Sequence, residues 1–250
     1  MARPMPPLPR PAAPPPDAIR TVREPLSAYL ARTDHVSSSM LRRFAAGLPA
    51  FAETFPGSLL GDALHALLLE PEAFDAQYLA LDGSVPAAGG LTEGDAMART
   101  WLSPEQLAAL RRAAGAVQAW PQAPVGEWLR QGRKELSVYW RDEQGGAWKA
   151  RPDCFTDEVI VELKTTFDCR PDAFAATRAR LGYDLQAAHY VEAVTLLTGR
   201  RPRFVFVAVE VTVPGAVRVH ELAPAALDAA TEELERLKAR FLTARSGGQP

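Results

Sequence analysis

The stretch KARPDCFTDEVIVELKTT, which runs from Lys149 to Thr166, decides the fold of this chain. We interpret its two halves as strands, because the second half is rich in Val, Ile and Thr and the TD pair between the halves is typical of a tight turn. Asp153 stands before the turn, and Glu162 and Lys164 stand after it, next to the apolar run VIV at 159–161. We therefore predict an antiparallel hairpin that carries Asp153, Glu162 and Lys164.

The segments around this hairpin extend it into a larger sheet. The segment RDEQGG joins a further strand at 134–140 to the one at 147–155, so that 158–166 becomes the third strand of an antiparallel meander. Two more strands are expected at 203–211 and 216–222. Capping residues and apolar spacing predict helices at 37–47, 57–71, 103–120, 183–199 and 224–244. This order predicts an α/β or α+β fold, in which helices flank one mixed central sheet.

Composition limits the class of protein. The 250 residues are 47% hydrophobic, enough to bury a sizeable core, and the formal net charge is only −2. Cys154 and Cys169 form no CxxC pair, which argues against structural zinc, an iron–sulfur centre and a disulfide framework. The longest apolar runs are far shorter than a membrane span. We therefore expect a cytoplasmic protein that makes no contact with a membrane.

Proline divides the chain into a tail and a domain. Residues 1–22 begin with MARPMPPLPRPAAPPP, which predicts an extended, disordered tail without a packed core. The remaining residues, 23–250, are expected to form a single domain with a helical N-terminal part.

The charges of the hairpin point to chemistry. Asp153 and Glu162 are nine positions apart, so a short turn can bring them together at one end of the sheet. Two neighbouring carboxylates raise each other's pKa unless a divalent cation binds both, and Mg²⁺ or Mn²⁺ suits oxygen ligands. Lys164 lies on the same strand face as Glu162 and could stabilise a developing anion. The alternative is a surface ion pair, but the apolar neighbours of Glu162 predict a buried strand and favour a metal-dependent hydrolase.

Several motifs together resemble a known superfamily. RPD, VELKTT and YDLQAAHY resemble the motifs of the PD-(D/E)XK nucleases, with the QxxxY motif of the RecB-like members, and more closely the RecE (exonuclease VIII) group. Upstream, VSSSMLRRFAAGLPAF and GDALHALLLEPEAFDAQY resemble the N-terminal helices and histidine motif of that group, and GRKELSVYW its first strand. The resemblance covers roughly residues 27–220 and implies a restriction-endonuclease-like core.

The resemblance also implies roles for individual residues. His65, Asp153 and Glu162 would ligate two Mg²⁺ or Mn²⁺ ions, together with the backbone carbonyl of Leu163. Lys164 would be the catalytic lysine and would act with Asp153 and Glu162.

Other residues have two readings each. Glu135 could reach the metals through water or neutralise a nearby base, or it could be a surface charge at a strand edge. His65 could instead be a core histidine that is hydrogen-bonded to the backbone. Gln186 and Tyr190 lie on one helix face, where they could grip a phosphate or stack on a sugar or base, or they could form a half-buried face. The following arginines are either phosphate contacts or solvated charges: Arg151, Arg178, Arg180, Arg200, Arg201 and Arg203.

Taken together, these observations predict a Mg²⁺-dependent exodeoxyribonuclease that acts on double-stranded DNA ends. The resemblance implies resection of the 5′-ended strand in phage recombination, with a single-strand annealing protein as partner and a ring-shaped homo-oligomer as a possible assembly. Two alternatives remain. One is an endonuclease, or a nuclease specific for branched DNA or RNA, and the other is a DNA-binding module without catalysis.

Overall fold

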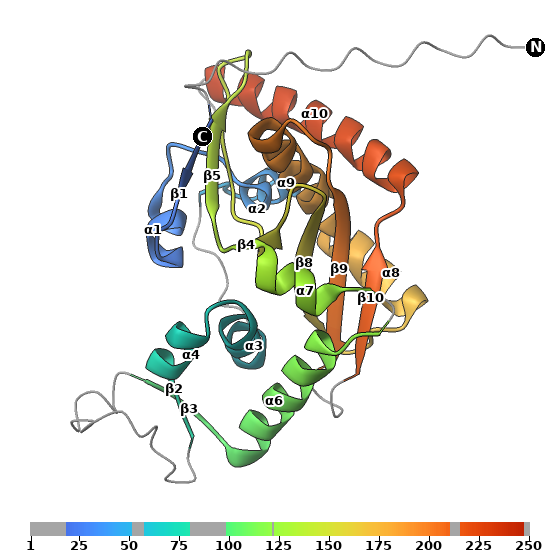
Figure 1. The fold of residues 1–250 in the computed structure, drawn as a ribbon. Helices are drawn as coiled ribbons and strands as arrows, with labels where there is room; N and C mark the ends of the chain where they lie inside the picture. Colours follow the sequence, from blue (N-terminus) through green and yellow to red (C-terminus); the bar gives the residue numbers. More distant parts are fainter. Residues whose placement is uncertain (1–18, 52–57, 81–98, 122, 211–215, 248–250) are drawn as a thin grey trace, which may run out of the picture.

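The computed structural model describes residues 19–51, 58–80, 99–121, 123–210 and 216–247, and the main sheet lies at its centre (Figure 1). Strands β8 and β9 of this sheet are parallel, and its other neighbouring pairs are antiparallel. The strand order is β10 (Val217–Glu221), β9 (Arg203–Glu210), β8 (Val159–Thr166), β7 (Cys154–Phe155) and β4 (Arg133–Lys134). The predicted mixed sheet with an antiparallel part is confirmed.

A second, three-stranded antiparallel sheet takes up part of the predicted meander. It consists of β1 (Ile19–Val22), β5 (Ser137–Arg141) and β6 (Ala147–Ala150). The expectation of one sheet was therefore wrong, because the predicted strands at 134–140 and 147–155 each break and contribute to both sheets.

The two breaks have identifiable causes. Pro152 cannot donate a ladder hydrogen bond, so the strand cannot continue through it. Glu135 has a φ of 49°, a left-handed conformation that is costly for a residue with a Cβ atom. Its N–H donates to the carbonyl of Asp153 over 3.1 Å, which ties the two breaks together.

The N-terminal boundary also differs from the prediction. Residues 19–22 were assigned to the proline-rich tail, but they pair with β5, with Ile19 opposite Trp140 and Val22 opposite Ser137. The β-branched side chains of this segment favour a strand, and the proline-rich run ends before it. Residues 1–18 lie outside the described residues.

Helices cover both faces of the main sheet, as predicted (Figure 1). On one face lie α2 (Ser38–Ala45), α9 (Tyr183–Thr198) and α10 (Pro224–Ser246). On the other lie α3 (Leu59–Leu69), α6 (Pro104–Gln118) and α7 (Val125–Gln131). The remaining described elements are α1 (Leu26–Ala31), α4 (Pro71–Gln77), α8 (Pro171–Leu181) and the parallel pair β2 (Tyr78–Ala80) and β3 (Thr100–Leu102).

The predicted helix ends are confirmed where capping residues marked them. The Ser37 and Ser103 hydroxyls accept from the N–H groups of Met40 and Gln106 at the starts of α2 and α6. Gly199 ends α9 with a φ of 72°. No helix in the described part of the chain is both long and apolar enough to cross a bilayer.

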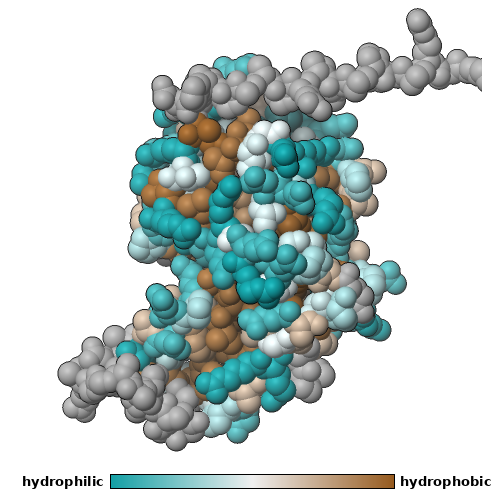
Figure 2. All heavy atoms as spheres, viewed as in Figure 1, coloured by the Kyte–Doolittle hydropathy of each residue, from teal (hydrophilic) through white to brown (hydrophobic). Residues whose placement is uncertain are grey.

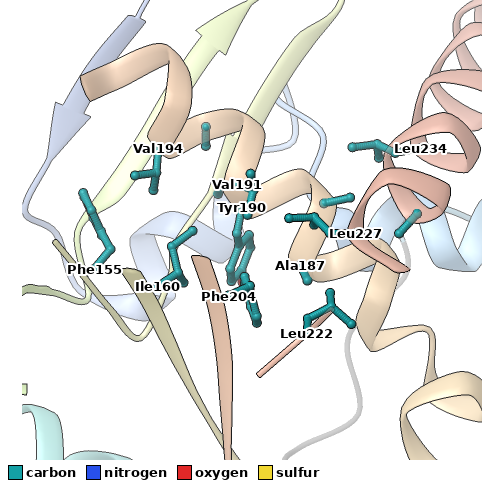
Figure 3. Close-up of a cluster of buried hydrophobic side chains, with 14 of the residues drawn as sticks. Phe155, Ile160, Ala187, Tyr190, Val191, Val194, Phe204, Leu222, Leu227 and Leu234 are labelled. Carbon is teal, nitrogen blue, oxygen red and sulfur yellow. The ribbon is translucent and has the colours of Figure 1, made fainter. Parts of the chain in front are cut away.

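Side-chain alternation along β8 separates two hydrophobic cores. Val161 and Leu163 pack into the core under α3, α6 and α7, whereas Ile160 packs into the core under α9. Figure 3 shows Ile160 in that second core with Tyr190 and Phe204. Glu162 shares the strand face of Ile160, so its carboxylate is directed toward α9.

One face of the molecule carries both polar and apolar residues. Figure 2 shows hydrophilic residues over much of this face, with apolar patches both in the upper half and in the lower half, where α3 and α6 lie.

Candidate active site

Asp153 and Glu162 lie side by side, as the hairpin predicted. An oxygen of Asp153, Oδ2, accepts a hydrogen bond from the N–H of Leu163 over 2.7 Å. The N–H of Asp153 in turn donates to Glu162 Oε2 over 3.4 Å. Both residues are buried, with exposed fractions of 7% and 2%. Each acidic residue is therefore held by the backbone of the other's strand.

His65 reaches the same place from α3. Its Nδ1 lies 3.6 Å from Asp153 Oδ1, and its Nε2 lies 3.2 Å from the carbonyl oxygen of Leu163. If Nε2 carries the proton and donates to that carbonyl, the Nδ1 lone pair faces Asp153, an arrangement typical of a metal-ligating histidine. The same hydrogen bond also fits a core histidine, so the contact itself supports both predicted readings.

A glycine lets α3 approach β8 this closely. The helix begins at Ser58, whose hydroxyl accepts from the N–H of Gly61. A Cβ atom on Gly61 would come within 2.9 Å of the Thr165 hydroxyl oxygen and within 2.7 Å of the Ser58 hydroxyl oxygen. A larger residue there would require these two hydroxyl groups to move, and the Ser58 hydroxyl caps the helix that carries His65.

Glu135 completes a group of possible metal ligands. One ligand atom from each of His65, Glu135 and Asp153 can be chosen so that all lie within 4.8 Å of one another. Imidazole and carboxylate are donors that Mn²⁺ accepts, and carboxylates suit Mg²⁺. The break at Glu135 therefore brings a residue predicted for an outer position into the ligand group.

The carboxylate of Glu162 has other partners. Its Oε1 accepts from the ammonium of Lys164 over 2.8 Å and from the amide of Gln186 over 2.9 Å. Among the residues that the structure describes, Glu162 is not part of the converging group of His65, Glu135 and Asp153, although the resemblance implies that it is a ligand.

Burial and neighbouring negative charges raise the pKa values of the acidic residues in this group. Burial, followed by the charge of Glu162, raises the pKa of Asp153 well above its ordinary value. Burial and the charge of Asp153 raise the pKa of Glu135 to about 7. Burial and the nearby Lys164 ammonium lower the pKa of His65, which favours a neutral imidazole. A divalent cation would relieve the repulsion between the acids.

Lys164 stays charged in this setting. Burial lowers its pKa, but the charges of Glu162 and Asp153 outweigh burial, so the pKa is raised above its ordinary value. The ammonium lies 4.7 Å from the centre of the Tyr183 ring. Tyr183 was not among the predicted site residues, although its place one turn before Gln186 on a helix could have indicated a shared face.

Gln186 and Tyr190 differ from the expected substrate-gripping pair. Both are 8% exposed, and the Gln186 amide donates to Glu162 and, over 3.1 Å, to the Tyr190 hydroxyl. Figure 3 shows Tyr190 within the hydrophobic core. In this placement Gln186 contacts Glu162 directly, and Tyr190 is connected to Glu162 through Gln186.

Arg151 was predicted to be a phosphate contact or a solvated charge, but the structure places it in the interior. It is buried, and its guanidinium donates to Glu135 Oε2 over 2.6 Å, to the Glu24 carbonyl over 2.8 Å and to the Ser137 hydroxyl over 3.1 Å. The side chain points inward, and its guanidinium N–H groups are already bonded to groups within the protein.

The other predicted arginines fall into two groups. Arg178 is half-buried beside Asp184, 2.7 Å from Oδ1, and Arg180 is exposed on the same helix. Strand register places Arg203 opposite Val159, at the far end of β8 from Lys164. The structure therefore does not bring Arg203, or its neighbours Arg200 and Arg201, to the acidic cluster.

Comparisons with known proteins agree with this architecture. Residues 51–250 match the family model described as "PDDEXK-like domain of unknown function (DUF3799)". No curated protein matches the chain. A solved structure described as "Putative exonuclease", from Eubacterium rectale, is 16% identical, with 92% of this chain and 89% of that chain covered and a TM-score of 0.62, which shows a shared fold. A phage related exonuclease from Haemophilus somnus 129PT is 12% identical, with 84% and 96% covered and a TM-score of 0.32.

Proposed function

Because the chain belongs to this PDDEXK-like family, and so to the PD-(D/E)XK nuclease superfamily, we propose that it is a metal-dependent exodeoxyribonuclease acting on double-stranded DNA ends. The observation that carries the proposal is the mutual hydrogen bonding of Asp153 and Glu162, with the Lys164 ammonium on Glu162. The description of the Eubacterium rectale structure, whose fold this chain shares, supports an exonuclease.

The residues present fit a divalent cation. His65, Glu135 and Asp153 would hold Mg²⁺ or Mn²⁺, since their ligand atoms already converge and the acids repel one another without it. A second ion would draw on Glu162 and the Leu163 carbonyl, which bond to Lys164, Gln186 and His65 within the protein. When bound, the cation supplies charge against phosphoryl oxygens and makes water a better nucleophile.

Lys164 acts through its charge. An ammonium whose pKa is raised cannot accept a proton at neutral pH, so it serves as a hydrogen-bond donor to the attacking water or to the phosphoryl oxygens. In the transition state of hydrolysis, negative charge lies on the non-bridging phosphoryl oxygens and develops on the leaving 3′-oxygen. Glu162, held by Gln186, keeps the ammonium in place.

We further propose the finer features that the resemblance implies. The enzyme would resect the 5′-ended strand in the cytoplasm and leave the 3′-ended strand to a single-strand annealing partner. A homo-oligomer around DNA is part of the same proposal.

The test is digestion of linear and covalently closed circular duplex DNA with Mg²⁺ or Mn²⁺, and with EDTA. We expect metal-dependent loss of the linear duplex alone, and faster release of label from the 5′ end than from the 3′ end. Glu162→Gln should abolish digestion, whereas Glu158→Gln, an exposed glutamate just before the same strand, should not. Equal cleavage of circles would show an endonuclease, and no digestion with any metal would show a binding module.

A further inference from the structure

Positive charge is concentrated on three segments of the chain. Residues 38–51, 173–183 and 239–247 contain six arginines and no acidic residue. The whole chain has 28 basic and 30 acidic residues, so the rest carries 22 basic residues against all 30 acidic ones. We call the surface formed by these segments the basic face; its arginines are Arg42, Arg43, Arg178, Arg180, Arg240 and Arg245.

Contacts between helices bring the three segments together. The Arg42 guanidinium donates to the carbonyl of Leu181, and its side chain lies against Gly182, where a Cβ atom would come within 2.9 Å of the Arg42 Cδ. These contacts join α2 to the corner between α8 and α9.

The third segment joins through aromatic rings. Phe44 of α2 meets Phe241 of α10 edge to face at 5.3 Å between ring centres. Arg240 lies over the Phe44 ring at 6.0 Å, and Arg245 lies over the Phe51 ring at 5.9 Å. The last turns of α10 therefore lie on the same side as α2, in the upper part of Figure 1.

The basic face begins at the candidate active site. Tyr183 directly follows Gly182, against which Arg42 packs, and its ring lies 4.7 Å from the Lys164 ammonium. Tyr183, which belongs to the basic face, therefore connects this face to Lys164.

Three of the arginines carry charge that the described residues leave uncompensated. Arg180, Arg240 and Arg245 are exposed, and within residues 19–51, 58–80, 99–121, 123–210 and 216–247 none of them forms an ion pair. Such charges attract phosphates by releasing the counterions that surround a nucleic acid.

Apolar side chains are exposed between these charges. Leu48, Phe51 and Leu181 have exposed fractions of 52%, 45% and 37%. A duplex presents phosphates and sugars on its outside and keeps its bases stacked within. A single strand also offers base faces, which pack on aromatic and aliphatic side chains between phosphate contacts.

We propose that the basic face binds single-stranded DNA, the strand that is fed to the active site or left by it. This inference rests on the proposed function and deepens it, because it names the form of nucleic acid that lies next to Lys164. Arginines would contact phosphates, while Leu48, Phe51 and Leu181 would contact bases.

The test compares two sets of three arginines by fluorescence anisotropy. The probes are a single-stranded oligothymidylate and a blunt duplex of matched length, both in EDTA so that neither is cut. The test variant changes Arg180, Arg240 and Arg245 to Gln. The control variant makes the same change of charge at exposed positions of α6 and α7, with Arg111, Arg112 and Arg130 changed to Gln.

We expect the test variant to bind the oligothymidylate on the order of 10- to 100-fold more weakly at about 0.1 M salt, with a salt dependence shallower by about two in log–log slope. The control should bind like the wild type. Leu48→Ser with Phe51→Ser should lose on the order of tenfold for the single strand and little for the duplex. All the changed side chains are partly or fully exposed, so melting temperatures should stay close to wild type.

The outcomes separate the inference from the proposed function. Equal losses in the two arginine variants, or no binding of the single strand by the wild type, would overturn the inference even if duplex ends are digested. Arginine-dependent binding without digestion in any metal would leave the basic face in place and overturn the nuclease. A duplex-selective loss in the serine variant would also count against a single strand.

Discussion

Gln186 Nε2 donates a hydrogen bond to Glu162 Oε1 over 2.9 Å, on the same carboxylate oxygen that accepts from Lys164 over 2.8 Å. This oxygen of Glu162 thus links Gln186 on α9 to Lys164 on β8. Because Gln186 is buried, its contact with substrate is limited, and we interpret it as a positioning residue that fixes the Glu162–Lys164 pair.

Gln186→Met should impair catalysis more than substrate binding. The change keeps the volume and removes a hydrogen bond to a charged group, worth about 1.5–3 kcal/mol, so we expect kcat to fall about 10- to 100-fold. Steady-state kinetics on duplex ends measures this, with Tyr190→Phe as a milder variant. A raised KM with unchanged kcat would instead return Gln186 to the role of gripping the substrate.

Lys164→Ala and Asp153→Asn should separate charge stabilisation from metal binding. Removing the ammonium should leave Mn²⁺ affinity unchanged or raised, because a like charge is lost beside the cation, while cleavage falls about 10²- to 10⁴-fold. The Asp153→Asn variant should lose both Mn²⁺ binding and cleavage. Calorimetric Mn²⁺ titration beside a nuclease assay distinguishes them, and wild-type cleavage by Lys164→Ala would remove the lysine from the mechanism.

Divalent metal should stabilise the native chain. The acids converge only when folded, so Mn²⁺ should add about 2–3 kcal/mol at roughly a hundredfold excess over Kd. Thermal melts with Mn²⁺ and with EDTA measure the shift, which should vanish in Asp153→Asn. A melting temperature that ignores millimolar Mn²⁺ would contradict the site.

Arg151→Met should lower the free energy of unfolding without a direct effect on DNA contacts. It leaves the partly buried Glu135 carboxyl, whose pKa is already raised to about 7, without its charged partner, and protonation of that carboxyl limits the cost to about 1–3 kcal/mol. Arg133→Met is the matched control, because it breaks an ion pair with Asp157 that is about half exposed and should cost at most about 1 kcal/mol. Urea unfolding compares them; a stable Arg151→Met with weakened DNA binding would restore the phosphate contact.

His189 should make stability depend on pH. It is fully buried beside Trp140, and its Nε2 lies 2.9 Å from the Lys149 carbonyl. Burial, with the nearby Lys238 ammonium, lowers its pKa from 6.5 to about 3. Between these values the unfolded chain binds a proton that the native state refuses, so stability falls as pH falls, by about 1.4 kcal/mol per pH unit.

The variant His189→Gln tests this, since its amide can still donate to the backbone but does not titrate. As the pH falls below about 6.5, the wild type should lose more unfolding free energy than the variant does. Parallel pH curves for the two proteins would show that His189 does not control this window.

Short-range chemistry accounts for the parts that could be predicted. Ser37, Ser103 and Gly199 cap helices through groups only a few residues away, and such signals are complete in the local sequence. The pairing of Asp153 with Glu162 follows in the same way, because a short turn determines the register of a hairpin.

The division into two sheets could not be predicted from these signals. The strands of the meander carry Trp140 and Trp148, which are buried against α9 and α10. Both indoles lie in that core while Val161 faces the opposite one, so the segments on either side of Glu135 and Pro152 pair in different sheets. Pro152 is a local signal for one of the breaks, but the left-handed backbone of Glu135 and the sheet that each segment joins depend on tertiary packing.

The sequence by itself determined the hairpin, its acids, its lysine and the membership of the chain in a nuclease superfamily, since all of these lie in contiguous motifs. Only the tertiary structure decided which atoms each surrounding side chain contacts. His65 meets Leu163 across 98 positions and Gln186 meets Glu162 across 24, and both contacts depend on how α3 and α9 pack against β8. The physical reason is that the local sequence does not determine whether such a side chain points inward or toward solvent. The packing of the helices on the sheet, which buries their apolar faces, determines it.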